Sequence, residues 1–138
     1  MKASSSLAMV IGFILAALGI IGLISPDTYV RLGWFWAEPP GIYIVPAVQL
    51  VMGLVLLRAA PSSRTPVGLG VLGAFALAEA VLMPLLGHGR TRGIAHWWGS
   101  QTYGSLRLWA LLELAIGILV VIAVLPSRRA LHPATSAT

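Results

Sequence analysis

Residues 47–64 read AVQLVMGLVLLRAAPSSR, an apolar run with one glutamine inside it and a basic end. Residues 111–129, LLELAIGILVVIAVLPSRR, follow almost the same pattern. Such runs approach the length of about 20 apolar residues that a helix needs to cross the core of a bilayer. Neither run alternates apolar and polar residues with a period of two, so both are predicted as membrane helices rather than barrel strands.

The composition of the whole chain also places it in a membrane. Of its 138 residues, 58% are apolar and only 9% are charged, whereas soluble domains carry roughly 25% charged residues. The absence of cysteine excludes disulfides, thiolate metal sites and cysteine nucleophiles. We assign the net charge of +5 to residues that set the membrane topology, so nucleic acid is not expected as a partner.

Four apolar stretches predict an all-α integral membrane protein, a four-helix bundle that forms a single domain over residues 1–126. The first stretch is long and lacks an Ala-x-Ala cleavage site, which favours a retained span over a signal peptide. The polar tail, 127–138, is expected to be disordered. The four expected spans are 7–25, 41–60, 67–87 and 105–125.

The distribution of basic residues predicts the orientation of these spans. The side that holds both termini carries Lys and Arg without any acid, whereas Asp27 and Glu38 lie among the arginines of the other side. Cytoplasmic loops carry the excess of positive charge. Both termini are therefore expected in the cytoplasm, with the chain in a bacterial inner membrane.

The two halves of the chain match when one is shifted by 64 positions. A two-span unit returns to the side where it started, so a second copy would insert in the same orientation. We therefore expect two tandem hairpins, over 7–64 and 70–129, related by a pseudo-twofold axis along the membrane normal. The matching residues are Gln49 with Glu113, Gly53 with Gly117, and Trp34 with Trp98.

Three polar residues fall at a similar depth inside the expected spans: Gln49, Glu79 and Glu113. Each lies roughly 10 to 12 Å below the outer end of its helix, at 1.5 Å per residue. Polar groups that faced lipid would cost several kcal/mol, so we expect the three to meet inside the bundle. Two carboxylates cannot both stay ionised cheaply there, and at least one is expected to keep its proton.

This polar layer has two interpretations. It is either a proton-linked site or a pocket for a polar head, such as a quinone carbonyl or a lipid headgroup. Otherwise it is a structural contact, in which a glutamine–glutamate hydrogen bond holds the helices together. No Lys or Arg lies at that depth to neutralise the acids, which keeps the first interpretation open.

Small residues at a spacing of four predict close contacts between helices. Glycine and alanine allow two backbones to approach, so we read these residues as packing positions. The third-span set borders Glu79, where close packing would help to bury that acid. The predicted packing residues are Gly12, Ala16, Gly53, Gly70, Ala74, Ala78 and Gly117.

The two outer loops are rich in tryptophan, which prefers the headgroup level of a membrane. The first loop starts with Ser25 and Pro26, which can cap a short helix. We expect interfacial helices or turns, or alternatively an aromatic lid over the polar layer. His88 and His96 lack metal-site spacing and are expected to be ordinary loop residues. The four tryptophans of the lid are Trp34, Trp36, Trp97 and Trp98.

The layout resembles that of small bacterial four-helix membrane proteins of the DoxX-like group. GLISPD closes the first span, GLVLLRAAPSSR closes the second, and two further spans complete the 138 residues. DoxX itself is associated with quinone-linked oxidation in a partner complex. No functional residue of that group can be matched here, so the resemblance implies a layout rather than a reaction.

No catalytic motif occurs in the chain, and no cofactor or metal site is predicted. The expected function is that of a non-catalytic accessory or interaction subunit of a larger membrane complex, or of a self-associating bundle. Its expected partners are membrane lipids and either another membrane protein or further copies of itself. The alternative is a quinone, lipid or proton site built on the polar layer.

Overall fold

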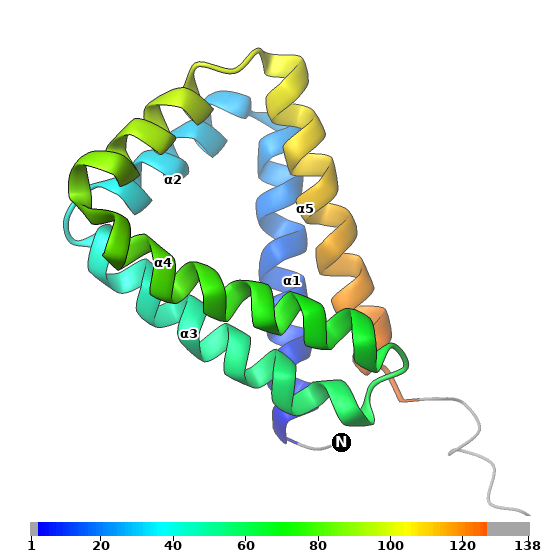
Figure 1. Cartoon of the computed structure of the whole chain (residues 1–138). Helices are drawn as coiled ribbons and strands as arrows, with labels where there is room; N and C mark the ends of the chain where they lie inside the picture. Colours follow the sequence, from blue (N-terminus) through cyan, green and yellow to red (C-terminus); the bar gives the residue numbers. More distant parts are fainter. Residues whose placement is uncertain (1–2, 127–138) are drawn as a thin grey trace, which may run out of the picture.

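A computed structural model describes residues 3–126, and the regular structure in that range is helical throughout (Figure 1). Four segments of this range are long and apolar enough to cross a membrane: α1, α3 together with η1, α4 and α5. The predicted all-α, four-span architecture is confirmed, while the predicted polar tail, 127–138, lies outside the described residues. In chain order the helices are α1 (Ala3–Ile24), α2 (Pro26–Ala37), α3 (Gly41–Ala59), the 3-10 helix η1 (Ala60–Ser62), α4 (Pro66–Gly99) and α5 (Tyr103–Val124).

The short helix α2 begins where its sequence predicts. The hydroxyl oxygen of Ser25 accepts a hydrogen bond from the backbone amide of Thr28 at 3.4 Å, and Pro26 opens the helix. Proline suits this position because the first amides of a helix have no partner inside it. The expected cap and short helix after the first span are therefore confirmed.

Helix α4 is too long to be one straight span. Its 34 residues would extend about 50 Å at 1.5 Å per residue, against a hydrocarbon core of about 30 Å. At Gly87 the backbone adopts φ 79° and ψ 165°, a conformation essentially restricted to glycine. The chain turns there, and the segment 88–99 lies beside α2 (Figure 1).

The spans associate in two pairs, α1 with α5 and α3 with α4. Glycines allow the backbones of each pair to touch. A Cβ on Gly117 would lie 2.6 Å from the carbonyl oxygen of Gly12 and would also clash with Ala16. A Cβ on Gly53 would lie 2.9 Å from the carbonyl oxygen of Gly73. The first span thus pairs with the fourth, and the second with the third.

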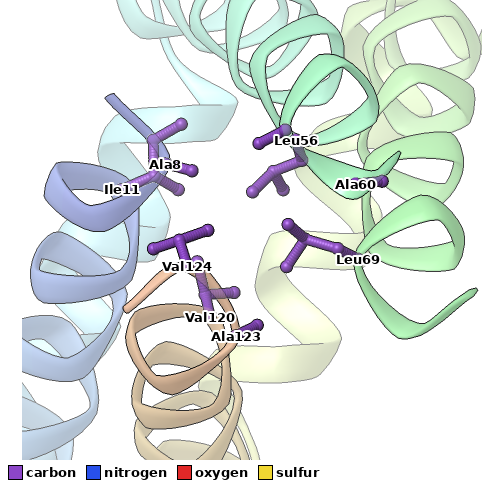
Figure 2. Packing of buried hydrophobic residues seen from close by; sticks show 9 residues of the cluster. Ala8, Ile11, Leu56, Ala60, Leu69, Val120, Ala123 and Val124 are labelled. Atoms are coloured by element: carbon purple, nitrogen blue, oxygen red, sulfur yellow. The ribbon is translucent and has the colours of Figure 1, made fainter. Parts of the chain in front are cut away.

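An apolar core lies at one end of the molecule, where both helix pairs meet (Figure 2). The backbone amide of Arg64, in the α3–α4 connection, donates to the carbonyl oxygen of Ala123 at 2.8 Å. From this end the two pairs diverge, and α2 with segment 88–99 joins them at the other end, called the distal end below (Figure 1). The core residues are Ala8, Ile11, Leu56, Ala59, Ala60, Leu69, Val120, Ala123 and Val124.

One predicted packing ridge is wrong. Ala74 and Ala78 are exposed, and the space beside Gly70 is open. Gly73, the residue before Ala74, contacts α3 instead, so a different face of α4 lies against its neighbour. A spacing of four residues identifies a stripe along a helix, but α4 carries several such stripes, and the spacing does not say which of them meets a neighbour.

Candidate intramembrane polar site

The first polar contact joins the second and third spans. Gln49 Nε2 on α3 donates a hydrogen bond to Glu79 Oε2 on α4 at 3.0 Å, and both side chains are partly buried. Gln49 lies one helical turn before Gly53, where the two backbones approach most closely. The second amide atom, Gln49 Oε1, is buried and accepts no hydrogen bond among the described residues.

The second polar contact joins the distal end to the fourth span. The Tyr29 hydroxyl on α2 donates to Glu113 Oε2 on α5 at 2.6 Å. Burial, together with the hydrogen bond to Glu113 and its charge, raises the pKa of Tyr29 well above the ordinary value. Tyr29 therefore remains a neutral donor. Gly22 makes room for it, because a Cβ there would lie 3.0 Å from the tyrosine ring.

The expected three-residue layer is divided between these two contacts. Gln49 and Glu79 meet, whereas the hydrogen-bond partner of Glu113 is Tyr29. Depth along a helix predicts the level of a residue in the membrane but not its lateral position. The α1–α5 and α3–α4 pairs diverge toward the distal end (Figure 1). Two residues at the same depth therefore lie apart when they belong to different pairs.

Tyr29 is the site residue that sequence reasoning missed. Tyrosine, like tryptophan, is typical of the headgroup level, which accounts for the ring of Tyr29 but not for the contact of its hydroxyl group. The only sequence signal is indirect. A helix that starts at Pro26 places Tyr29 one turn after its cap, near the end of the first span, but nothing local indicates that it points toward Glu113.

The predicted aromatic lid is distributed unevenly. Trp98 packs edge-on against Tyr29, with ring centroids 4.8 Å apart, and so covers the contact with Glu113. Trp34 makes a similar edge contact with His96 at 5.8 Å. Trp36 and Trp97 are exposed at the distal end. Within residues 3–126, Trp98 is the one tryptophan of the four with a ring contact to a residue of the polar pairs.

Three further polar contacts hold the distal end together. The Tyr103 hydroxyl on α5 donates to Asp27 Oδ1 on α2 at 2.8 Å, and Arg107 Nε donates to the carbonyl oxygen of Leu23 at 3.3 Å. Arg92 on α4 forms an ion pair with Glu38 at 2.8 Å. The Tyr103 and Arg92 contacts hold α2 and its C-terminal end between α5 and segment 88–99, and they account for both acids of the outer loops. The Arg107 contact joins α5 to the end of α1.

No protein family model, curated protein or solved structure matches this chain. The likeness to the DoxX-like group therefore stays a prediction from the layout of the sequence. The site has to be interpreted from its own geometry.

Proposed function

We propose that this protein is a non-catalytic accessory or interaction subunit of a larger membrane complex, or a self-associating bundle. The observation that carries this proposal is how the intramembrane acids are used. Glu79 and Glu113 each accept a hydrogen bond from a neighbouring helix of the same chain. Such bonds are typical of contacts that hold helices together in a membrane.

The distribution of buried surface supports the same proposal. In the most apolar stretches of α3 and α4, 17% of the residues are buried within the chain, against 28% in α1 and α5. The α3–α4 pair therefore offers the larger unoccupied apolar surface. A membrane-protein partner or a second copy would pack there by shape, because lipid tails are as apolar as the side chains they contact.

Native mass spectrometry of the protein, extracted in lipid nanodiscs, tests this proposal. A large partner in fixed stoichiometry, or a defined oligomer, is expected. The assembly should persist in Glu79→Gln and Glu113→Gln, since glutamine keeps the shape of each side chain and an acceptor oxygen. Recovery of only monomer, with or without a bound small molecule, would contradict the proposal.

A second candidate is a proton-linked or small-molecule site at Gln49 and Glu79, and the unpaired Gln49 Oε1 favours it. A buried carbonyl oxygen without a donor costs about 1–3 kcal/mol. A proton carried by Glu79, or the hydroxyl of a bound quinol or lipid headgroup, would supply that donor. Infrared difference spectroscopy tests this: a protonated carboxyl band that disappears in Glu79→Gln supports the site, and its absence from the wild type excludes the proton.

We also propose that both termini lie in the cytoplasm of a bacterial inner membrane, from the excess of basic residues at that end. The cysteine-free sequence allows a direct test by single-cysteine labelling in intact cells. Ser62→Cys, near the core end, should be protected from an impermeant maleimide. Ser100→Cys, at the distal end, should react, and the reverse pattern would contradict the orientation.

A further inference from the structure

The distal end carries an open groove beside the Trp34–His96 and Arg92–Glu38 contacts. It has a volume of about 470 Å³ and is lined by Trp34 of α2 and by Arg92, Gly93, His96 and Trp97 of α4. Positions 92, 93, 96 and 97 fall on one face of a helix. The volume lies within the range of small-ligand sites, about 300–1,000 Å³.

Arg92 gives this groove its chemical character. The Nε atom of Arg92 forms an ion pair with Glu38 Oε1, and 55% of the Arg92 side chain is exposed. An arginine has five N–H donors in a planar fork, so the edge that faces away from Glu38 can still bind an anion. Within residues 3–126 no other partner of the Arg92 guanidinium is found. Planar bidentate donors of this kind suit phosphate oxygens.

The net charge of the distal end also favours an anion. The distal end carries four arginines and two acids, Asp27 and Glu38. Asp27 is occupied by the Tyr103 hydroxyl, and Glu38 by Arg92 itself. The remaining excess is positive and is not balanced by another carboxylate of the described chain. The arginines are Arg31, Arg90, Arg92 and Arg107.

The position of the groove indicates where the anion comes from. Segment 88–99 lies beyond the turn at Gly87, after a stretch long enough to cross the hydrocarbon core. Trp34 and Trp97 are of the residue type that gathers at the headgroup level. Phospholipids are the abundant phosphate-containing molecules at this level. Their glycerol and upper acyl chains would contact the indole rings.

We propose that the groove between α2 and segment 88–99 is a binding site for the phosphate headgroup of an anionic phospholipid. Arg92 binds the phosphate, and Trp34, His96 and Trp97 surround the glycerol. A free phosphate would satisfy Arg92 but would leave the aromatic walls without a ligand. The site is separate from Glu79 and Glu113 and does not depend on the proposed subunit role.

The test uses the full chain, delipidated in detergent and titrated with phosphatidylglycerol, with bound lipid counted by native mass spectrometry. The wild type should retain one lipid in preference to phosphatidylcholine. Arg92→Gln should weaken this binding by about tenfold or more, since it removes a charged hydrogen-bond donor. Arg90→Gln removes a distal-end charge outside the groove and should weaken binding far less than Arg92→Gln; an equal loss in the two variants would contradict direct binding by Arg92.

A steric pair of variants provides the second arm. A Cβ on either Gly93 or Gly89 would meet open space, but only Gly93 lines the groove. Gly93→Leu should fill the groove and abolish lipid retention, whereas Gly89→Leu should not. Circular dichroism verifies that each variant is folded. If Gly93→Leu does not fold, the comparison of Arg92→Gln with Arg90→Gln decides alone.

The source of the phosphate is tested with inorganic phosphate alone. Millimolar phosphate should neither displace the lipid nor raise the thermal midpoint of the delipidated protein. Displacement by phosphate would overturn the assignment to a lipid. Equal lipid retention in the wild type, Arg92→Gln and Arg90→Gln would overturn the site itself.

Discussion

The Tyr29 hydroxyl donates a 2.6 Å hydrogen bond to Glu113 Oε2, and this bond links the short helix α2 to α5, the fourth membrane span. Trp98 from the end of α4 packs against the same tyrosine ring. One side chain thus connects α2, α4 and α5. Three predictions concern the polar contacts of the chain, and two concern its glycines.

Tyr29→Phe is expected to lower the free energy of unfolding by about 1–2 kcal/mol. The ring still fills its space, but Glu113 loses its donor. Unfolding in mixed detergent micelles, followed by circular dichroism, measures the change. Tyr43→Phe is the matched control, since Tyr43 is 75% exposed, and it should have no measurable effect. Equal effects of the two substitutions would show that the bond to Glu113 contributes nothing.

The ionisation of Tyr29 makes the stability sensitive to alkali. Its pKa is higher in the folded protein than in the unfolded chain, where tyrosine titrates near pH 10. The folded state therefore holds the proton more tightly, and this stabilisation is complete below about pH 10 and declines above it. The stability difference between wild type and Tyr29→Phe should shrink above that pH. A difference that grows in alkali would contradict the prediction.

Gln49→Leu is expected to cost about 1–3 kcal/mol, because Glu79 is left partly buried without its donor. The double variant Gln49→Leu with Glu79→Leu should recover part of that loss, since neither polar group then remains unpaired. A double-mutant cycle measures the coupling between the two positions. Additive effects would mean that the two side chains do not interact in the membrane.

The two helix pairs depend on glycine where their backbones touch. Gly117→Ala should destabilise the protein by about 1–3 kcal/mol, because the added methyl group meets backbone atoms of Gly12 and Ala16. Gly70→Ala is the control, since its methyl group meets open space and alanine is the better helix former. It should be neutral or stabilising. If Gly70→Ala destabilised the protein, Gly70 would be a packing position as the sequence predicts, for example in a contact with a second copy.

Gly87→Ala should strain the turn in α4, because φ 79° and ψ 165° suit glycine almost exclusively. The expected cost is about 1–3 kcal/mol, or a shift of segment 88–99 away from α2. Trp98 would then move relative to Tyr29, which tryptophan fluorescence can report. Gly89→Ala, two residues further on in regular helix, is the control; it should leave the fluorescence unchanged and the stability unchanged or slightly higher.

The sequence predicts much of the fold because lipid imposes simple rules. Length, hydropathy and the lack of alternation identify four helical spans, and Ser25 with Pro26 marks the start of α2. The turn at Gly87 is different, because chain length alone does not locate it. A short helix or a turn is expected in the second outer loop, but neither the conformation of Gly87 nor the extent of the helix to Gly99 follows from composition.

The site was less predictable than the fold, and the reason is geometric. Hydropathy places Gln49, Glu79 and Glu113 at a similar depth, but the lateral arrangement of the helices decides which of them meet. The contact of Gln49 with Glu79 requires the second span beside the third, and Glu113 meets Tyr29 because α2 lies against α5. The internal repeat over 7–64 and 70–129 stays a prediction.

The pairing of α1 with α5 has a consequence for how the chain is made. The ribosome releases α1 first and α5 last, yet Gly12 finds its backbone contact only at Gly117. The newly inserted first helix must therefore remain in the bilayer, with its glycine face uncovered, until α5 has been inserted. The α3–α4 hairpin can close earlier. If synthesis stalls before Tyr103, α5 is missing and α1 has no partner helix. Such a chain would be a substrate for the proteases that remove misassembled membrane proteins.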